Sequence, residues 1–236
     1  MDFSQAIKGL ENGANIDLSV LKEPRGVTRV LQFVISIVAA LFLYGYEGKI
    51  SIQYCDDRDL ELTYSYPFRL TNIVKNATCN GTLHKVTFFE DDGFSIYAEY
   101  FLYISLASML FCVVVMFIYV KMTSAYETDN RYPLGDFIGT MVLAVFWLFC
   151  SAAWSHGLSF LKVTTSPKVL IRYLKNADTA NTMKFVSVKT SSYFGLNVSA
   201  LLGCLSFFLW AADLWFLYKE TPWFQGGRPE AVGSPA

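Results

Sequence analysis

Four long apolar stretches constrain this chain more than any other feature of its 236-residue sequence. They cover residues 30–46, 97–120, 134–154 and 193–218. A helix rises about 1.5 Å per residue, so roughly 20 apolar residues cross the ~30 Å hydrocarbon core of a bilayer. The first stretch is the shortest, and residues 27–29 extend it, with Arg29 expected to reach the headgroups. Because lipid offers the backbone no hydrogen-bond partners, we predict an all-α membrane protein, a bundle of four transmembrane helices.

Composition supports a membrane protein and excludes other classes. Hydrophobic residues make up 53% of the chain and charged residues only 17%, which is outside the range of ordinary soluble domains. A net charge of −1 offers no basic surface for nucleic acid. We therefore expect a four-span domain over residues 27–220, an amino-terminal tail over 1–26 and a short carboxyl-terminal tail over 221–236. An even number of spans places both tails on one side.

The Lys and Arg counts of the loops do not decide the orientation of the chain in the membrane. The loop 47–96 does indicate it. It holds Cys55 and Cys79, the two cysteines outside the expected spans, and two glycosylation sequons that begin at Asn76 and Asn80. A disulfide needs an oxidising compartment, and N-glycosylation needs the secretory lumen. We therefore predict that this loop is luminal, that Cys55 pairs with Cys79, and that both tails are cytoplasmic. A further sequon at Asn197 falls within the start of the fourth span, too close to the membrane to be used.

Both luminal loops carry patterns of secondary structure. Apolar and polar residues alternate over 50–54 and 60–66, and 86–89 offers a third short strand, so the first loop is predicted to be rich in β-structure. In the second loop, 155–192, Ser166 and Pro167 predict the start of a short amphipathic helix. This loop carries six Lys or Arg against Asp178 alone, whereas the first carries five against eight Asp or Glu. The opposite charges suggest that the two loops lie against each other.

Several residues of the spans are candidates for contacts with partners or lipid. Glu99, Asp136 and Asp213 lie near membrane boundaries, where acids are expected to reach headgroups. The alternative is an ion path or a polar contact with a partner, for which Glu99 is the first candidate. Two small-residue pairs allow close helix approach, either inside the bundle or at an oligomer seam: Gly135 with Gly139, and Ser199 with Gly203. One segment of the second span fits the loose cholesterol pattern through Val115, Tyr119 and Lys121. We find no motif for catalysis, a cofactor or a metal, and expect no enzyme.

Ordered motifs along the chain resemble those of the synaptophysin family. The segment 22–26, KEPRG, resembles the KEPxG segment of that family, and residues 66–70 match its YPFRL motif. Further motifs lie in the second, third and fourth spans: AEYF at 98–101, DF at 136–137, SAAW at 151–154, GLNVS at 195–199 and KET at 219–221. The resemblance covers residues 22–223, nearly the whole chain.

This resemblance implies a fold, a location and partners. Synaptophysins are four-helix membrane bundles of the MARVEL type in synaptic and secretory vesicles, where they associate with cholesterol, form homo-oligomers and bind the vesicle SNARE synaptobrevin. Two features depart from the family. The second luminal loop lacks the family's second cysteine pair, and the residues after the fourth span are few. The short tail is more similar to those of pantophysin and mitsugumin, or to that of a truncated or invertebrate synaptophysin.

The resemblance predicts a vesicle protein that organises lipid and SNARE partners in trafficking and exocytosis. Two alternative functions stay open. An oligomeric channel or transporter usually carries a polar stripe along one helix, whereas these spans are polar mainly at their ends. A cell-contact protein such as a claudin, tetraspanin or connexin carries loop cysteine motifs that do not occur in this sequence.

Overall fold

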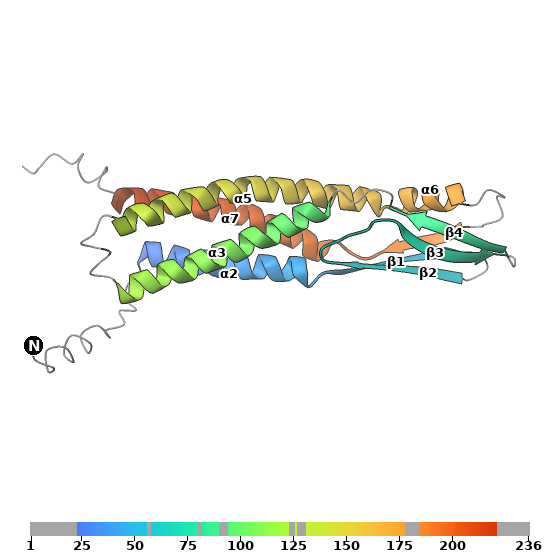
Figure 1. Ribbon diagram of the computed structural model, residues 1–236, viewed down its shortest axis with the longest axis horizontal. Coiled ribbons are helices and arrows are strands. Elements are labelled where there is room, and N and C mark those ends of the chain that lie inside the picture. Colours follow the sequence, from blue (N-terminus) through green and yellow to red (C-terminus); the bar gives the residue numbers. More distant parts are fainter. Residues whose placement is uncertain are drawn as a thin grey trace, which may run out of the picture. The chain divides into compact units, whose positions relative to one another are not determined.

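A computed structural model describes residues 23–55, 58–79, 82–89, 94–122, 126, 131–177 and 185–220. Most of both predicted tails therefore lies outside the described residues. The elements, labelled in Figure 1, are α2 (Pro24–Tyr44), β1 (Glu47–Tyr54), β2 (Arg58–Ser65), β3 (Ile73–Cys79), β4 (Thr82–Phe88), α3 (Ser95–Lys121), α5 (Arg131–Thr164), α6 (Pro167–Ala177), β5 (Phe185–Thr190) and α7 (Phe194–Glu220).

Four of these helices, α2, α3, α5 and α7, are long and apolar enough to cross a membrane, which confirms the predicted number of spans. Their ends differ from the prediction. Helix α2 begins at Pro24, because proline is favoured in the first turn of a helix, and it ends at Tyr44, just before Gly45. Helix α5 continues ten residues beyond the predicted end, to Thr164, because Leu158 and Leu161 extend its buried face.

The chain divides into two compact units. The tail unit comprises Met1–Ile37, Ile104–Leu148 and Cys204–Ala236; the loop unit comprises Val38–Tyr103 and Phe149–Gly203. Each long helix contributes residues to both. In the tail unit, Trp147 of α5 donates a hydrogen bond of 2.8 Å to Ser108 of α3, and Phe111 of α3 lies against Trp210 of α7.

A three-stranded antiparallel sheet in the loop unit joins the two loops. Its strand order is β2–β1–β5, with Ile50 opposite Leu62 on one side and opposite Thr190 on the other. The expected contact between the loops is therefore made by backbone pairing, and β5 was not predicted. The alternating burial of β1 places Ile50 and Ile52 inward, as the sequence pattern predicts.

A separate hairpin, β3–β4, and helix α6 complete the loop unit. Residues 86–88 of the predicted strand 86–89 belong to β4, which begins earlier, at Thr82, and its partner β3 was not predicted. Helix α6 begins directly after Ser166, whose carbonyl accepts the amide hydrogen of Leu170 at 3.1 Å, as the Ser-Pro signal indicates. Leu170 and Leu174 are buried, and Tyr173 packs against Phe88 and Phe89.

Within the loop unit, a hydrogen bond and a ring contact of Trp154 join α5 to α7 and to the segment after β2. Trp154 of α5 is buried and donates a hydrogen bond of 2.9 Å to Ser199 of α7. Its ring stacks on Phe68, which follows β2 and the cis peptide bond between Tyr66 and Pro67. The segment that matches the family motif at residues 66–70 is thus the one that brings the end of β2 onto the helices of this unit.

Candidate functional site

The tail unit contains a buried polar cluster centred on Arg29, to which α2, α3, α5 and α7 all contribute. We call it the Arg29 network; its members are Thr28, Arg29, Gln32, Tyr119, Asp136, Thr140 and Asp213. The side chains of Arg29 and Asp213 are 0% exposed and that of Asp136 is 4% exposed. Charges buried within membrane-spanning segments are costly, so they mark a site that is expected to have a function.

Helical periodicity explains how the sequence builds this cluster. On α2, Arg29, Gln32 and Ser36 are buried, and spacings of three and four residues place them on one face. On α5, Asp136 and Thr140 are one turn apart in the same way. Each of the three charged residues lies within two turns of a helix end: Arg29 near the start of α2, Asp136 near the start of α5, and Asp213 near the end of α7. The polar faces of separate helices therefore meet at one depth.

Arg29 bridges the two acids. Its Nη2 lies 2.6 Å from Oδ1 of Asp136, and its Nη1 lies 3.1 Å from Oδ2 of Asp213. The same guanidinium donates to Oε1 of Gln32 at 2.9 Å and to Oγ1 of Thr140. Since a guanidinium presents several donors in a fixed plane, one arginine can join helices α2, α5 and α7.

Each carboxylate also accepts hydrogen bonds from neutral groups. Asp213 accepts from the hydroxyl of Thr28 at 2.9 Å and from Nε2 of Gln32 at 3.1 Å. Asp136 accepts from the phenol of Tyr119 on α3, and the phenol of Tyr126 lies 3.5 Å from the same oxygen. These donors take the place of the water that a carboxylate would otherwise bind.

Aromatic rings enclose the cationic side of the cluster. The guanidinium carbon of Arg29 lies 5.4 Å from the ring centre of Phe111 and 5.2 Å from that of Trp210. That of Arg25, one turn earlier on α2, lies 5.3 Å from the ring centres of both Tyr119 and Tyr126. Rings at these distances attract a cation without offering it water.

Two consequences follow from this geometry. A buried ion pair stabilises little relative to apolar residues, but losing one partner leaves a buried charge unpaired and costs about 3–5 kcal/mol. Because each charge has its partner on another helix, the network requires α2, α5 and α7 to meet in one register.

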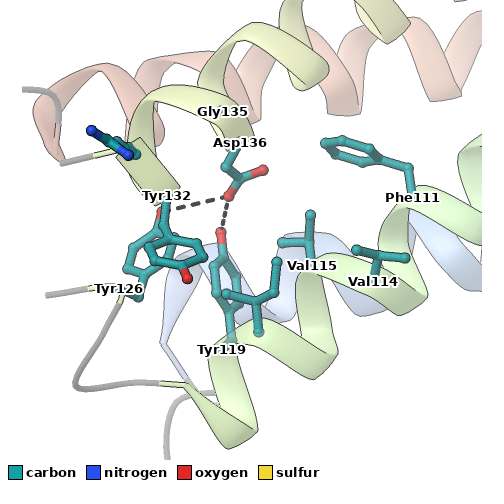
Figure 2. A pocket seen from close by; sticks show the side chains of 10 residues that line it. Phe111, Val114, Val115, Tyr119, Tyr126, Tyr132, Gly135 and Asp136 are labelled. Carbon is teal, nitrogen blue, oxygen red and sulfur yellow. Dashed lines mark hydrogen bonds between the residues drawn. The ribbon is translucent and has the colours of Figure 1, made fainter. Parts of the chain in front are cut away.

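A small cavity lies beside the network, between α3 and α5 (Figure 2). Its volume is about 180 Å³, and it is lined by Phe111, Val114, Val115, Ile118, Tyr119, Tyr126, Arg131, Tyr132, Gly135 and Asp136. Figure 2 shows Tyr119 pointing from α3 toward Asp136, so the carboxylate and the phenol form its polar end. Nothing lies within 4 Å of the position that a Cβ on Gly135 would take. Most of the lining is apolar or aromatic.

The structure corrects the expectation for charged residues near the membrane boundaries. Arg29, Asp136 and Asp213 were expected to reach headgroups, but they are buried and paired with one another. Glu99, by contrast, makes an ion pair of 2.9 Å with the exposed side chain of Arg69 in the loop unit. The acids expected to be solvated are thus the ones that the protein encloses.

The small-residue pairs divide between close contacts and open space. A Cβ on Gly139 would lie 2.4 Å from the ring of Phe111, and one on Gly203 would lie 2.7 Å from the ring of Phe101. Ser199 is bonded to Trp154. These three positions serve contacts inside a unit. Gly135 borders the cavity instead, so it makes no close helix contact within the described part of the chain.

The residues of the cholesterol pattern do not share a surface. Val115 and Tyr119 are buried and line the cavity, whereas Lys121 is exposed at the end of α3. A lipid that contacts Val115 and Tyr119 would therefore have to enter between α3 and α5.

The predicted modifications map onto the loop unit. Asn76 is exposed on β3, while Asn80 lies outside the described residues. Cys55 is buried, and the side chain of Cys79 is not among those described, so their pairing stays a prediction; Cys112, Cys150 and Cys204 are free. The discounted Asn197 lies in the first turn of α7, where it accepts a hydrogen bond of 2.6 Å from Lys162.

Sequence reasoning missed Arg29, Gln32 and Thr140 as members of a site. The available signal was their periodicity. On the first span, Arg29, Gln32 and Ser36 are polar residues at helical spacing, which indicates a polar helix face. One arginine with two aspartates in three spans indicates a buried ion-pair cluster.

A family comparison agrees with the four spans. The model of the MARVEL membrane-associating domain matches residues 20–216, which covers the four apolar helices almost completely. The chain belongs to the MARVEL membrane-associating domain family.

Proposed function

We propose that this MARVEL protein is a non-enzymatic component of synaptic or secretory transport vesicles, with both termini in the cytosol. In this role it forms homo-oligomers, associates with cholesterol and binds the vesicle SNARE synaptobrevin. Family membership and the four spans support a multi-pass membrane protein. The motifs shared with synaptophysins, from residue 22 to residue 223, support the finer assignment.

The observation that carries this proposal is the closure of the Arg29 network. Its charged groups bond to one another across α2, α5 and α7, and aromatic rings cover the guanidinium. A pore needs polar groups that face water along its length. Charges that satisfy each other instead favour a rigid scaffold, whose outer apolar helix faces contact lipid and the spans of partners.

An exposed face of α3 supports the partner assignment. Leu106, Leu110, Val113 and Phe117 are each about half exposed or more, and their spacing of four, three and four residues places them in one stripe. A single-span SNARE could lie along such a stripe through van der Waals contact. Cholesterol could contact the same apolar surface or the cavity beside Tyr119.

The test is recovery of partners from intact vesicles. A tagged copy should concentrate on small vesicles, and synaptobrevin and a photoactivatable cholesterol probe should cross-link to it there. Junctional localisation, or conductance of the purified protein in planar bilayers, would instead support the cell-contact or channel alternative. Absence of synaptobrevin among the cross-linked proteins would refute the SNARE assignment alone.

Orientation has its own test. Glycosidase should reduce the apparent mass of the wild type, and Asn76→Gln together with Asn80→Gln should abolish that change. A shift that persists in the double variant would implicate Asn197, whereas protease protection of both tails in sealed vesicles would show that the assigned orientation is reversed.

A further inference from the structure

Helix α6 presents a basic stripe that no acid of the described chain neutralises. Lys168, Arg172 and Lys175 are exposed and follow one another at intervals of four and three residues, so they share one face. The opposite face, with Leu170 and Leu174, is buried. Among the described residues, none of the three cations has an ion-pair partner.

Strand β2 presents a matching acidic surface. Asp59 and Glu61 are exposed, and the register of β1 and β2 places them opposite Gln53 and Ser51 on the polar face of the sheet. No ion pair of the described chain involves either acid. Their net charge is complementary to that of the α6 stripe.

These two surfaces lie at opposite borders of the loop unit. The sheet order β2–β1–β5 makes β2 one edge, while α6 contacts β5 and β4 on the other side. Figure 1 shows α6 and β2 on opposite sides of the sheet region. The stripe of one molecule therefore cannot cover the acids of the same molecule, although the acids of a neighbour are open to it.

The spacing of the charges also fits. Residues four apart on a helix face are separated by about 6 Å, and alternate residues of a strand by about 6.7 Å. Lys168 and Arg172 can thus face Asp59 and Glu61 in parallel. Two copies in one membrane have the same orientation, which keeps both surfaces on the same side of the bilayer.

We propose that a second copy of this chain docks its β2 acids on the basic stripe of α6, in a head-to-tail contact. Such a contact uses two different surfaces of each molecule, so it repeats around a ring if the rotation closes. The inference rests on the homo-oligomer of the proposed function and names its interface.

The experiment uses charge reversal and mixing of copies. One variant carries Lys168→Glu and Arg172→Glu, and the other carries Asp59→Lys and Glu61→Lys; each is expressed with two different tags in the full-length protein. Within either variant, the α6 stripe and residues 59 and 61 of β2 now carry charge of the same sign. Recovery of one tag with the other should therefore fall about tenfold in mild detergent at low salt.

Mixing the two variants should restore recovery, because the α6 stripe of each variant then meets β2 residues of opposite charge on the other. A control with Lys75→Glu and Lys85→Glu, which makes the charge change of the stripe variant on the β3–β4 hairpin instead, should recover like the wild type. A carbodiimide, which joins amines to carboxylates in contact, should link Lys168 or Lys175 to Asp59 or Glu61 of another copy in wild-type membranes. This last measurement does not depend on how the variants fold.

The outcomes separate the interface from the oligomer. If the variants recover like the wild type, or if mixing restores nothing, the interface is wrong while the oligomer stands. Loss on reversal of the stripe alone, without rescue, would assign α6 to another anionic surface such as lipid headgroups. A wild type that is monomeric in its native membrane would overturn both the interface and the proposed oligomer, but not the vesicle location.

Discussion

The two units of the molecule are stabilised by different chemistry, although the same four long helices run through both. In the tail unit, buried charges join the helices through Arg29, Asp136 and Asp213. In the loop unit, neutral contacts do so: the bond between Trp154 and Ser199, the stack of Trp154 on Phe68, and backbone pairing of strands. Charges specify partners strictly but tolerate no loss, whereas neutral contacts are individually weaker and more numerous.

Two buried cysteines allow each unit to be followed separately. Cys112 is buried in the tail unit and Cys150 in the loop unit, and both are free. In a Cys204→Ala background, replacing either Cys112 or Cys150 with Ala leaves the other as the single reporter of unfolding, followed through its reaction with a thiol dye during heating in detergent.

The largest effect is expected from Arg29→Met, which leaves two buried carboxylates without their cation. We expect the free energy of unfolding to fall by about 3–5 kcal/mol. The Cys112 reporter should react at a clearly lower temperature, and the Cys150 reporter should change less. Lys121→Met, which removes an exposed charge near a helix end, is the matched control and should change neither reporter by more than about 0.5 kcal/mol. Equal shifts in both reporters after Arg29→Met would mean that the units unfold together.

The second effect belongs to the loop unit. If Cys55 and Cys79 are bridged, replacing both with Ser should cost roughly 3–4 kcal/mol by the loop-closure argument, reduced by residual structure of the unfolded chain, and it leaves neither thiol free to react with the dye. The Cys150 reporter should respond and the Cys112 reporter should not. The unreduced, denatured wild type should contain three reactive thiols; finding five would rule out the bridge.

Replacing one tryptophan in each unit should lower the free energy of unfolding by a smaller amount, similar in the two units. Trp147→Phe removes the bond to Ser108 in the tail unit, and Trp154→Phe removes the bond to Ser199 in the loop unit. Each loss is worth about 1 kcal/mol plus the cost of the smaller ring. Each variant should shift mainly the reporter of its own unit. A much larger effect of Trp154→Phe would show that its stack on Phe68 outweighs the hydrogen bond.

The smallest effect is expected from Glu99→Gln. Its partner Arg69 is exposed, so the ion pair is screened by water and contributes at most about 1 kcal/mol. Both reporters should remain unchanged, and so should recovery of synaptobrevin. A fall in synaptobrevin recovery with unchanged stability would instead identify Glu99 as a partner contact.

Much of the fold could be predicted because a long apolar stretch of sequence indicates a membrane-spanning helix directly. The number of spans, the start of α6 and the alternation in β1 and β2 all follow from local patterns. The end of α5 was predicted too early, since Leu158 and Leu161 continue the buried face through residues of lower hydropathy. Strand β5 was missed because its pairing with β1 is set by residues far away in sequence.

The candidate site was harder to predict for a physical reason. Asp136 and Asp213 near helix ends have the same local sequence signature whether they face headgroups or an arginine. Only the meeting of three helices distinguishes the two cases, and that depends on helix rotation. The polar residues that share a face with Arg29, namely Gln32 and Ser36, are the part of the signal that the sequence does contain.

The pairing of β1 with β5 also orders events during synthesis. Strand β1 leaves the ribosome before α3 exists, whereas β5 follows α6, after two further spans. Until then one edge of β1 lacks its partner, and an unpaired edge invites aggregation. The sheet can close only when the third span has been inserted and the loop after it has crossed to the same side as β1. Closure of the sheet therefore requires that the second and third spans are correctly inserted. A nascent chain with one span misplaced would keep an unpaired edge of β1, which chaperones can recognise.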